Sequence, residues 1–336
     1  MSFKRLEQDD FIISSDAVSS TVWSTNSPTL TVFETSSVQE ASSTGNFYLN
    51  IYQTASTQPD AEIQFAISYG NKFGSGSILY NPAVAQNSPT KTIYGQYQNL
   101  VLGDENSDFS FGGTLSNDFW VLSIDRARYK EKLFLGSFTL SLSGSGGILS
   151  LTENSKTSTT QTFTEAGRVF QIVSGSMGNV FTGVNANGYS STSGSYGWFL
   201  PDIGTILLHP SALSQSIQLA PSYSINSDGL NNRRLYNAIN NPVSKSFRLN
   251  SEETITSDYV FVRPRNSEFN YSTNPSYVSG STGEVVYPLF INSPQTYITT
   301  VGLYNDSNEL LAVAKLSRPL LKDFTKEALI RIKLDF

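Results

Sequence analysis

The pattern that most constrains the fold is the alternation of apolar and charged side chains that runs through the last nine residues, 328–336, to the end of the sequence. Ile330, Ile332, Leu334 and Phe336 fall on one side of an extended strand, and the charged residues between them fall on the other. A sequence that ends in this way is expected to tie its last strand into a sheet. Because the same period of two recurs in many other segments, the sequence predicts a mainly β protein.

The other alternating segments are bounded by Gly, Pro, Asn and Ser. Residues 140–142 lie in phase with residues 149–151 across a Gly-rich turn, which predicts a hairpin. Residues 125–133 are the best candidate for a short helix or turn, and residues 233–239 are a second helical candidate. The remaining expected strands are 47–52, 63–69, 160–164, 168–174, 203–208, 259–263, 284–291, 296–304 and 310–316.

The order of these segments predicts antiparallel sandwich-like or barrel-like domains with long loops. We expect a Ser- and Thr-rich, extended N-terminal arm at 1–45, one or more β-rich domains at 46–250, and a C-terminal β-domain at 251–336. The arm contains short apolar islands, so it is either disordered or ordered against a neighbour. Residues 70–118 have little period and indicate a long functional or partner-bound loop.

Composition excludes several classes of function. Charged residues make up only 15% of the 336 residues, the net charge is −6, and there is no cysteine. A net negative charge argues against a nucleic-acid partner, and the absence of cysteine removes disulfides and thiolate metal sites. No apolar run is long enough to span a membrane, and the N-terminus lacks the apolar core of a signal peptide. We therefore expect synthesis in a cytoplasm and no membrane partner.

No motif in the sequence predicts catalysis, a cofactor or a metal. The single histidine, His209, follows an apolar strand and is expected to be a strand-end residue rather than a catalytic base. The acidic stretch at Asp104 fails the calcium-loop pattern because Phe109 and Leu115 occupy its Gly and Glu positions. Adjacent Glu252 and Glu253 would point to opposite faces of a strand. A looser calcium site and a convergence of distant carboxylates stay open.

Two segments indicate contact surfaces. The basic cluster around Arg126 and Arg128 is balanced by acidic neighbours, which is typical of a solvated helix face or of an ion-pair patch between subunits. The aromatic, Asn-rich loop 266–277 makes a poor strand but has the composition of an interface or a plain surface loop. The residues expected at an interface are Arg126, Arg128, Phe269, Tyr271, Pro275, Tyr277, Ile330, Ile332, Leu334 and Phe336.

Several blocks of the sequence resemble virion structural proteins of T4-like myoviruses, especially those that infect cyanobacteria. The most specific blocks are EFNYSTNP at 268–275, YITTVGLYND at 297–306 and ELLAVAKLSRP at 309–319. IDRARYKEK at 124–132 and YGWFLPDIGTI at 196–206 extend the resemblance over most of the chain. The C-terminal pattern is also similar to the attachment domain of some tail-collar fibre proteins.

The resemblance implies a non-enzymatic structural component of a contractile-tailed phage, located in the virion. It implies a place in the tail or baseplate, with fibre attachment as a further role, and partners that include other virion proteins, tail fibres and copies of the chain itself. One alternative is a neck, collar or capsid-decorating protein. A second is a glycan-binding module like that of a tailspike, which the aromatic and Asn content would fit.

Overall fold

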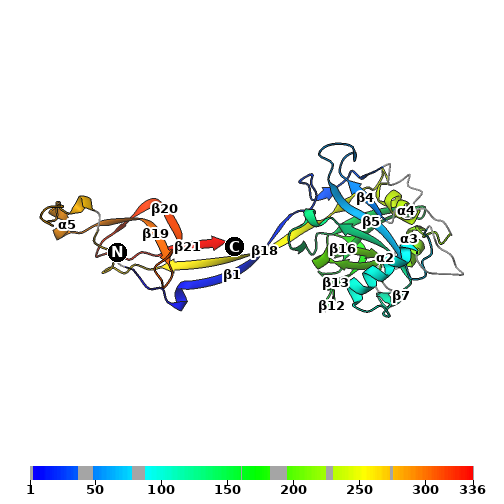
Figure 1. The fold of residues 1–336 in the computed structure, drawn as a ribbon, viewed down its shortest axis with the longest axis horizontal. Helices are drawn as coiled ribbons and strands as arrows, with labels where there is room; N and C mark the ends of the chain where they lie inside the picture. The colour runs from blue at the N-terminus through cyan, green and yellow to red at the C-terminus, as the bar shows by residue number, and fades with distance from the viewer. Residues whose placement is uncertain are drawn as a thin grey trace. The chain divides into compact units, whose positions relative to one another are not determined.

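The chain folds as two compact units in the computed structural model (Figure 1). Unit 1 comprises Met1–Ala17 and Thr254–Phe336, and unit 2 comprises Val18–Glu253. The structure describes residues 3–36, 48–77, 88–159, 161–181, 195–224, 230–272 and 275–335. This division differs from the three predicted segments because the N-terminal strand β1 is hydrogen-bonded to the distant strand β18, so residues from both ends of the chain share unit 1.

The prediction of a mainly β fold is confirmed: a large, curled antiparallel sheet in unit 2 forms a half-barrel. Its strands follow the order β2-β17-β10-β11-β13-β15-β16-β8-β5-β4-β3, with β12 and β14 attached to β13. Strands β2 to β5 are Thr29–Leu30, Glu34–Thr35, Tyr48–Tyr52 and Ile63–Asn71. Strand β8 is Asp118–Ile124, and strands β10 to β14 are Thr139–Gly144, Gly147–Glu153, Thr162–Thr164, Gly167–Ser176 and Asn179–Val180. Strands β15 to β17 are Gly197–Leu200, Thr205–Leu208 and Phe247–Arg248.

The larger hydrophobic core of unit 2 lies between one face of this sheet and two helices. These helices are α3 (Pro210–Ile217) and α4 (Leu230–Ile239), and the second confirms the helix expected at 233–239. Trp23, Phe65 and Phe247 pack edge-on or tilted against one another, with ring centroids 4.8 to 6.2 Å apart. Trp23, Leu30 and Phe33, from the middle of the predicted N-terminal arm, are part of this core.

The second core covers the opposite face of the same sheet. Helix α2 (Pro89–Tyr97), the π-helix η2 (Gln98–Leu102) and the small hairpin β6–β7 (Phe109–Phe111 and Thr114–Ser116) pack here. The prediction of a long loop at 70–118 is wrong for its described part, because aromatic residues of these elements pack on the sheet; residues 78–87 lie outside the described residues. All four residues of β15 and of β16 are buried, because these strands have a core on each side. This double burial explains their continuous apolar sequences.

Individual registers agree with the alternating pattern. Leu140 lies opposite Leu151 and Leu142 opposite Leu149, which confirms the predicted hairpin. Within residues 125–133, the predicted short helix or turn is the three-residue 3-10 helix η3 (Arg126–Arg128), and the short strand β9 (Lys132–Leu133) follows it.

Unit 1 is a thin β structure built around a three-strand order, β1-β18-β21. The strands are β1 (Phe11–Thr21), β18 (Asn250–Val262) and β21 (Ile330–Asp335), and the short 3-10 helix η1 (Gln8–Asp10) precedes them. A hairpin of β19 (Thr296–Tyr304) and β20 (Leu310–Lys322) packs over the side chains that β18 and β21 share. The unit boundary falls inside both β1 and β18.

The strand predicted at 284–291 is wrong. Pro288 removes a backbone donor there and instead caps the four-residue helix α5 (Leu289–Asn292), while only Val285 forms a single bridge, to Val278. Between β18 and this helix lies the 3-10 helix η5 (Pro275–Tyr277), and the 3-10 helix η4 (Pro201–Ile203) connects β15 and β16 in unit 2.

Candidate functional site

The basic cluster predicted at 126–132 is a capped turn on unit 2. The Asp125 carboxylate accepts a hydrogen bond from the backbone N–H of Ala127 at 2.9 Å, which starts η3. The guanidinium of Arg126 donates to the carbonyl oxygen of Tyr129 at 2.7 Å and lies over the Tyr129 ring, 4.7 Å from its centre. Arg126 is therefore already held by its own turn.

The other basic residues of this cluster pair with carboxylates of the same unit. Arg128 contacts Glu62 at 2.7 Å, Lys132 contacts Glu252 at 3.3 Å, and Lys130 contacts Glu253 at 3.7 Å. Ion pairs at such partly exposed positions contribute little to stability but fix the conformation of the turn. Because these partners belong to the same unit, the ion pairs hold the turn within unit 2. A contact with another subunit would have to use side chains that are already paired.

A second, more closely bonded ion pair lies beside this cluster. The guanidinium of Arg168 donates three hydrogen bonds to the Asp202 carboxylate at 2.6 to 3.2 Å, and the Arg168 backbone N–H adds a fourth at 2.8 Å. Partial burial alone would raise the pKa of Asp202, but the hydrogen bonds and charge of Arg168 lower it overall. The pair joins β13, an interior strand of the sheet, to η4.

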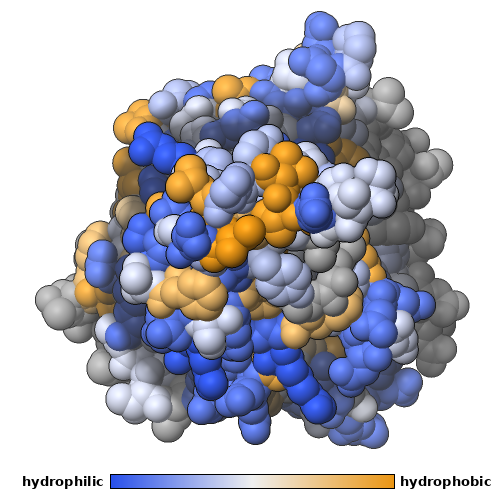
Figure 2. Space-filling model, turned by 90° about the vertical axis from the view of Figure 1, so that its left-hand side faces the viewer, coloured by the Kyte–Doolittle hydropathy of each residue, from blue (hydrophilic) through white to orange (hydrophobic). Residues whose placement is uncertain are grey.

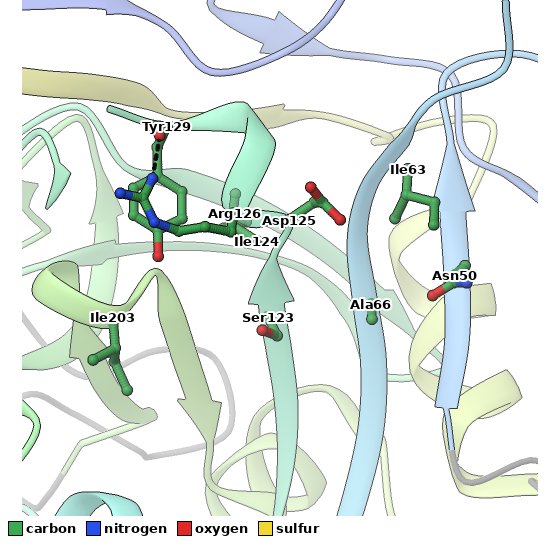
Figure 3. A pocket seen from close by; sticks show the side chains of 9 residues that line it. All are labelled: Asn50, Ile63, Ala66, Ser123, Ile124, Asp125, Arg126, Tyr129 and Ile203. Atoms are coloured by element: carbon green, nitrogen blue, oxygen red, sulfur yellow. Dashed lines mark hydrogen bonds between the residues drawn. The ribbon is translucent and has the colours of Figure 1, made fainter. Parts of the chain in front are cut away.

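A pocket of about 290 Å³ opens next to the turn (Figure 3). Strands β4, β5 and β8 and the helices η3 and η4 supply its walls. Its lining residues are Asn50, Ile63, Ala66, Ser123, Ile124, Asp125, Arg126, Tyr129 and Ile203. Asp125 is the only carboxylate among them, and it already accepts the Ala127 N–H. The pocket therefore offers neither a pair of carboxylates for hydrolysis nor a cluster of metal ligands.

The predicted interface loop lies in unit 1. The carbonyl oxygen of Phe269 accepts a hydrogen bond from Thr296 at 2.7 Å, and Phe269 adopts a positive φ of 55°. Tyr271 and Pro275 are exposed. Tyr277 packs against Phe290, with ring centroids 5.0 Å apart. The structure thus places these four residues along one loop whose aromatic rings are only partly covered.

The four predicted residues of the last strand have a different position. Ile330 and Ile332 are buried and Leu334 is half-buried, and all three pack under the hairpin β19–β20. Phe336 lies outside the described residues. Ile330 and Ile332 lie opposite Val262 and Val260 of β18. These side chains build the small core of unit 1, and little of their surface is available to a partner.

An exposed excursion begins within the last residues of the predicted loop. We give this name to residues 275–295, none of which is buried. A bridge between Val278 and Val285 and contacts of Tyr277 with Tyr287 and Phe290 hold its shape. Its exposed apolar side chains include Leu289, 79% exposed, and Ile291, 68% exposed. In Figure 2, viewed from the side where the α5 label lies in Figure 1, apolar residues reach the surface in groups among hydrophilic ones.

A buried lysine holds the beginning of the predicted interface loop 266–277. Lys322, at the end of β20, is fully buried, and its Nζ donates to the carbonyl oxygens of Asn266 and Asp323 at 3.0 Å and to Asn270 Oδ1 at 2.8 Å. Three acceptors satisfy the three N–H donors of the ammonium group, which is what burial of this group requires. In the sequence, Lys322 is a single lysine at the end of an apolar strand, and this pattern alone does not predict a buried, hydrogen-bonded ammonium group.

A buried carboxylate in unit 2 was also missed. Asp118 is 6% exposed, and its Oδ2 accepts hydrogen bonds from Tyr69 at 2.6 Å and from Tyr223 at 3.0 Å. Burial raises the pKa of Asp118, and the two tyrosine donors oppose this rise. Burial and the nearby carboxylate raise the pKa of Tyr69, so its hydroxyl stays a donor.

Replacing Asp118 by Asn should make the unfolding free energy less dependent on pH. Because the pKa of Asp118 is higher in the folded protein than in the unfolded chain, its contribution is fully present below about pH 4 and declines as the pH rises through the folded pKa. We therefore expect the unfolding free energy of the wild type to fall relative to Asp118→Asn as the pH rises above about 4. Urea unfolding at several pH values measures the difference, and parallel pH profiles of the two proteins would contradict it.

His209 comes directly after β16 and precedes α3, where it is 1% exposed. Its ring lies 5.2 Å from that of Phe111, and burial lowers the pKa of its imidazole. Asp104 accepts hydrogen bonds from the Asn106 N–H at 3.0 Å and from Ser107 Oγ at 2.8 Å, as in an ordinary polar turn. Among the described residues, no three His, Cys, Asp or Glu side chains converge as metal ligands.

In the parts of the chain that the structure describes, every helix is too short or too polar to cross a bilayer. Comparison of the chain with protein families, with curated proteins and with solved structures gave no match.

Proposed function

We propose that this protein is a non-enzymatic structural component of the virion of a contractile-tailed bacteriophage, located in the tail or baseplate, where it attaches fibres. The proposal combines the sequence blocks that resemble virion structural proteins with the different structures of the two units. Unit 2 has two hydrophobic cores and rigid, doubly buried strands, as a load-bearing body requires. Unit 1 provides exposed apolar surface for docking.

The observation that carries the proposal is the exposed excursion at 275–295. Ordering a chain costs about 1–2 kcal/mol per residue in backbone entropy. Burial of apolar area, which returns about 25 cal/mol per Å², normally offsets this cost. Since none of these residues is buried within the chain, the bridge and the aromatic contacts are its main internal stabilisation, and burial against a partner would supply the rest. Aromatic and aliphatic side chains such as Tyr287 and Leu289 are suited to such an interface core.

Immunogold labelling of purified phage particles tests the location. Antibodies against the recombinant chain are expected to label the tail or the baseplate. Labelling of the neck, the collar or the capsid surface would favour the alternative placement. Particles that bind no antibody, although the protein is present in the infected cell, would contradict a virion role.

A substitution in the exposed excursion tests the docking mechanism. We expect Leu289→Ser combined with Ile291→Ser to reduce incorporation into particles by about tenfold or more, because apolar anchors dominate interface energies. Both side chains are exposed, so the fold of the chain should be unaffected. The matched control is Leu115→Ser with Ile148→Ser, two comparably exposed apolar residues of unit 2. Equal incorporation of both variants, measured by quantitative mass spectrometry of particles, would contradict the mechanism.

A further inference from the structure

Strand β1 is the outermost strand of the sheet in unit 1. It is hydrogen-bonded to β18, whose other edge carries β21, and within the described residues it has no other strand partner. Ten of its eleven residues are exposed. One row of backbone N–H and C=O groups along β1 therefore has no neighbouring strand to hydrogen-bond with. With eleven residues, β1 is also longer than a usual edge strand.

This edge lacks the devices that normally prevent pairing between molecules. Natural edge strands are short, or they carry Lys, Pro or a bulge. The sequence of β1, FIISSDAVSST, contains no Lys, Arg, Pro or Gly, and Asp16 is its only charged residue. Phe11, Ile12 and Ile13 are 49%, 53% and 72% exposed, so apolar side chains project from both faces of the strand. Such an edge is suited to backbone hydrogen bonding with a strand of another molecule.

We propose that the partner strand is β1 of a second copy, paired antiparallel about a two-fold axis. An axis perpendicular to the sheet keeps each face of the sheet continuous across the junction, because directly opposite residues of antiparallel strands point to the same side. The two copies would form one six-strand order, β21-β18-β1-β1-β18-β21. This inference deepens the proposed function by naming one partner of the assembly, and it rests on that function for its biological setting.

The charge pattern of β1 is compatible with a second copy as the partner and favours one register over another. Residues 11–17 are the part of β1 that belongs to unit 1, and Ser14 is their centre. An axis at Ser14 pairs all seven residues, with Phe11 opposite Ala17 and Asp16 opposite Ile12 of the second copy. No like charges face each other in this register, whereas an axis at Asp16 would oppose two carboxylates. The Asp16 charge is also close to Lys333 of its own unit.

Single-cysteine crosslinking of the full chain tests the register, since the natural sequence has no cysteine. A residue on the axis lies opposite its own copy, within the reach of a disulfide. We expect Ser14→Cys to form a covalent dimer under mild oxidation. The control is Ser211→Cys, at an exposed position in α3 of unit 2, which should stay monomeric on the same gel. Equal crosslinking of the two variants would overturn the register.

Light scattering after size-exclusion chromatography tests the interface itself. The wild-type chain should have the mass of a dimer, and Ile13→Lys should weaken self-association by about tenfold or more, because lysine is a natural guard of sheet edges. Ile148→Lys, at an exposed apolar site in unit 2, should leave the dimer intact. A monomeric or trimeric wild type, or a dimer that Ile13→Lys does not weaken, would overturn the inference. A dimer that never enters particles would instead contradict the proposed function alone.

Discussion

A Gly197→Ala substitution is expected to lower the unfolding free energy of unit 2 by at least about 4 kcal/mol, which is beyond the usual range for one substitution. Gly197 is the first residue of β15 and lies opposite Leu208 of β16, with a φ of 145°. A Cβ atom there would overlap the carbonyl oxygen of Leu207 and stand 2.9 Å from the Cα of Leu208. Both contacts are backbone, and β15 is buried on both faces, so the strand has no free direction in which to move.

The three tryptophans make this prediction easy to measure. Trp23, Trp120 and Trp198 all belong to unit 2, so tryptophan fluorescence during urea unfolding reports on that unit. The matched control is Gly95→Ala in α2, where a Cβ meets no atom within 4 Å. The control should be neutral or more stable by up to about 1 kcal/mol, since alanine favours a helix. A Gly197→Ala protein as stable as the wild type would show that β15 can shift.

Side-chain alternation in the sequence was sufficient to predict most of the strands. Residues 63–69 became β5, and the last strand became β21, because each has one apolar row that a core can bury. The pairing partner of β21 was not predictable: Ile332 meets Val260, 72 positions earlier in the chain, and no local pattern encodes that choice. The sequence also carried an unused signal for α2, since Ser88 caps the helix and Pro89 occupies its first turn.

The predicted interface residues separate into two kinds in the structure. Tyr271 and Pro275 lie on the surface, whereas Ile330 and Ile332 are buried, although both sets are rich in apolar or aromatic groups. Sequence alone could not distinguish them, because alternation shows which side chains share a face and not what covers that face. The buried Asp118 was missed for a similar reason. Its two tyrosine partners are 49 and 105 positions away, and only the fold brings them together.

An Ile332→Asp substitution is expected to unfold unit 1 while unit 2 stays folded. The core of unit 1 contains only three buried apolar residues among those described, Val260, Ile330 and Ile332. A carboxylate at position 332 would be buried opposite Val260 without a partner charge, and burial of an unpaired charge exceeds the stabilisation that so small a core can supply. Hydrogen exchange should therefore show loss of amide protection in β19, β20 and β21.

Unit 2 should not respond to this change, because its two cores are separate from that of unit 1. The urea transition followed by tryptophan fluorescence should match that of the wild type, while the amides of unit 1 exchange freely. The matched control, Leu329→Asp, adds the same charge three positions earlier at a side chain that is 61% exposed, and it should keep the protection of both units. A shift of the tryptophan transition to lower urea in Ile332→Asp would mean that the two units unfold as one cooperative body. Unit 1 would then not be an independent docking module, and its exposed apolar surface would need another explanation.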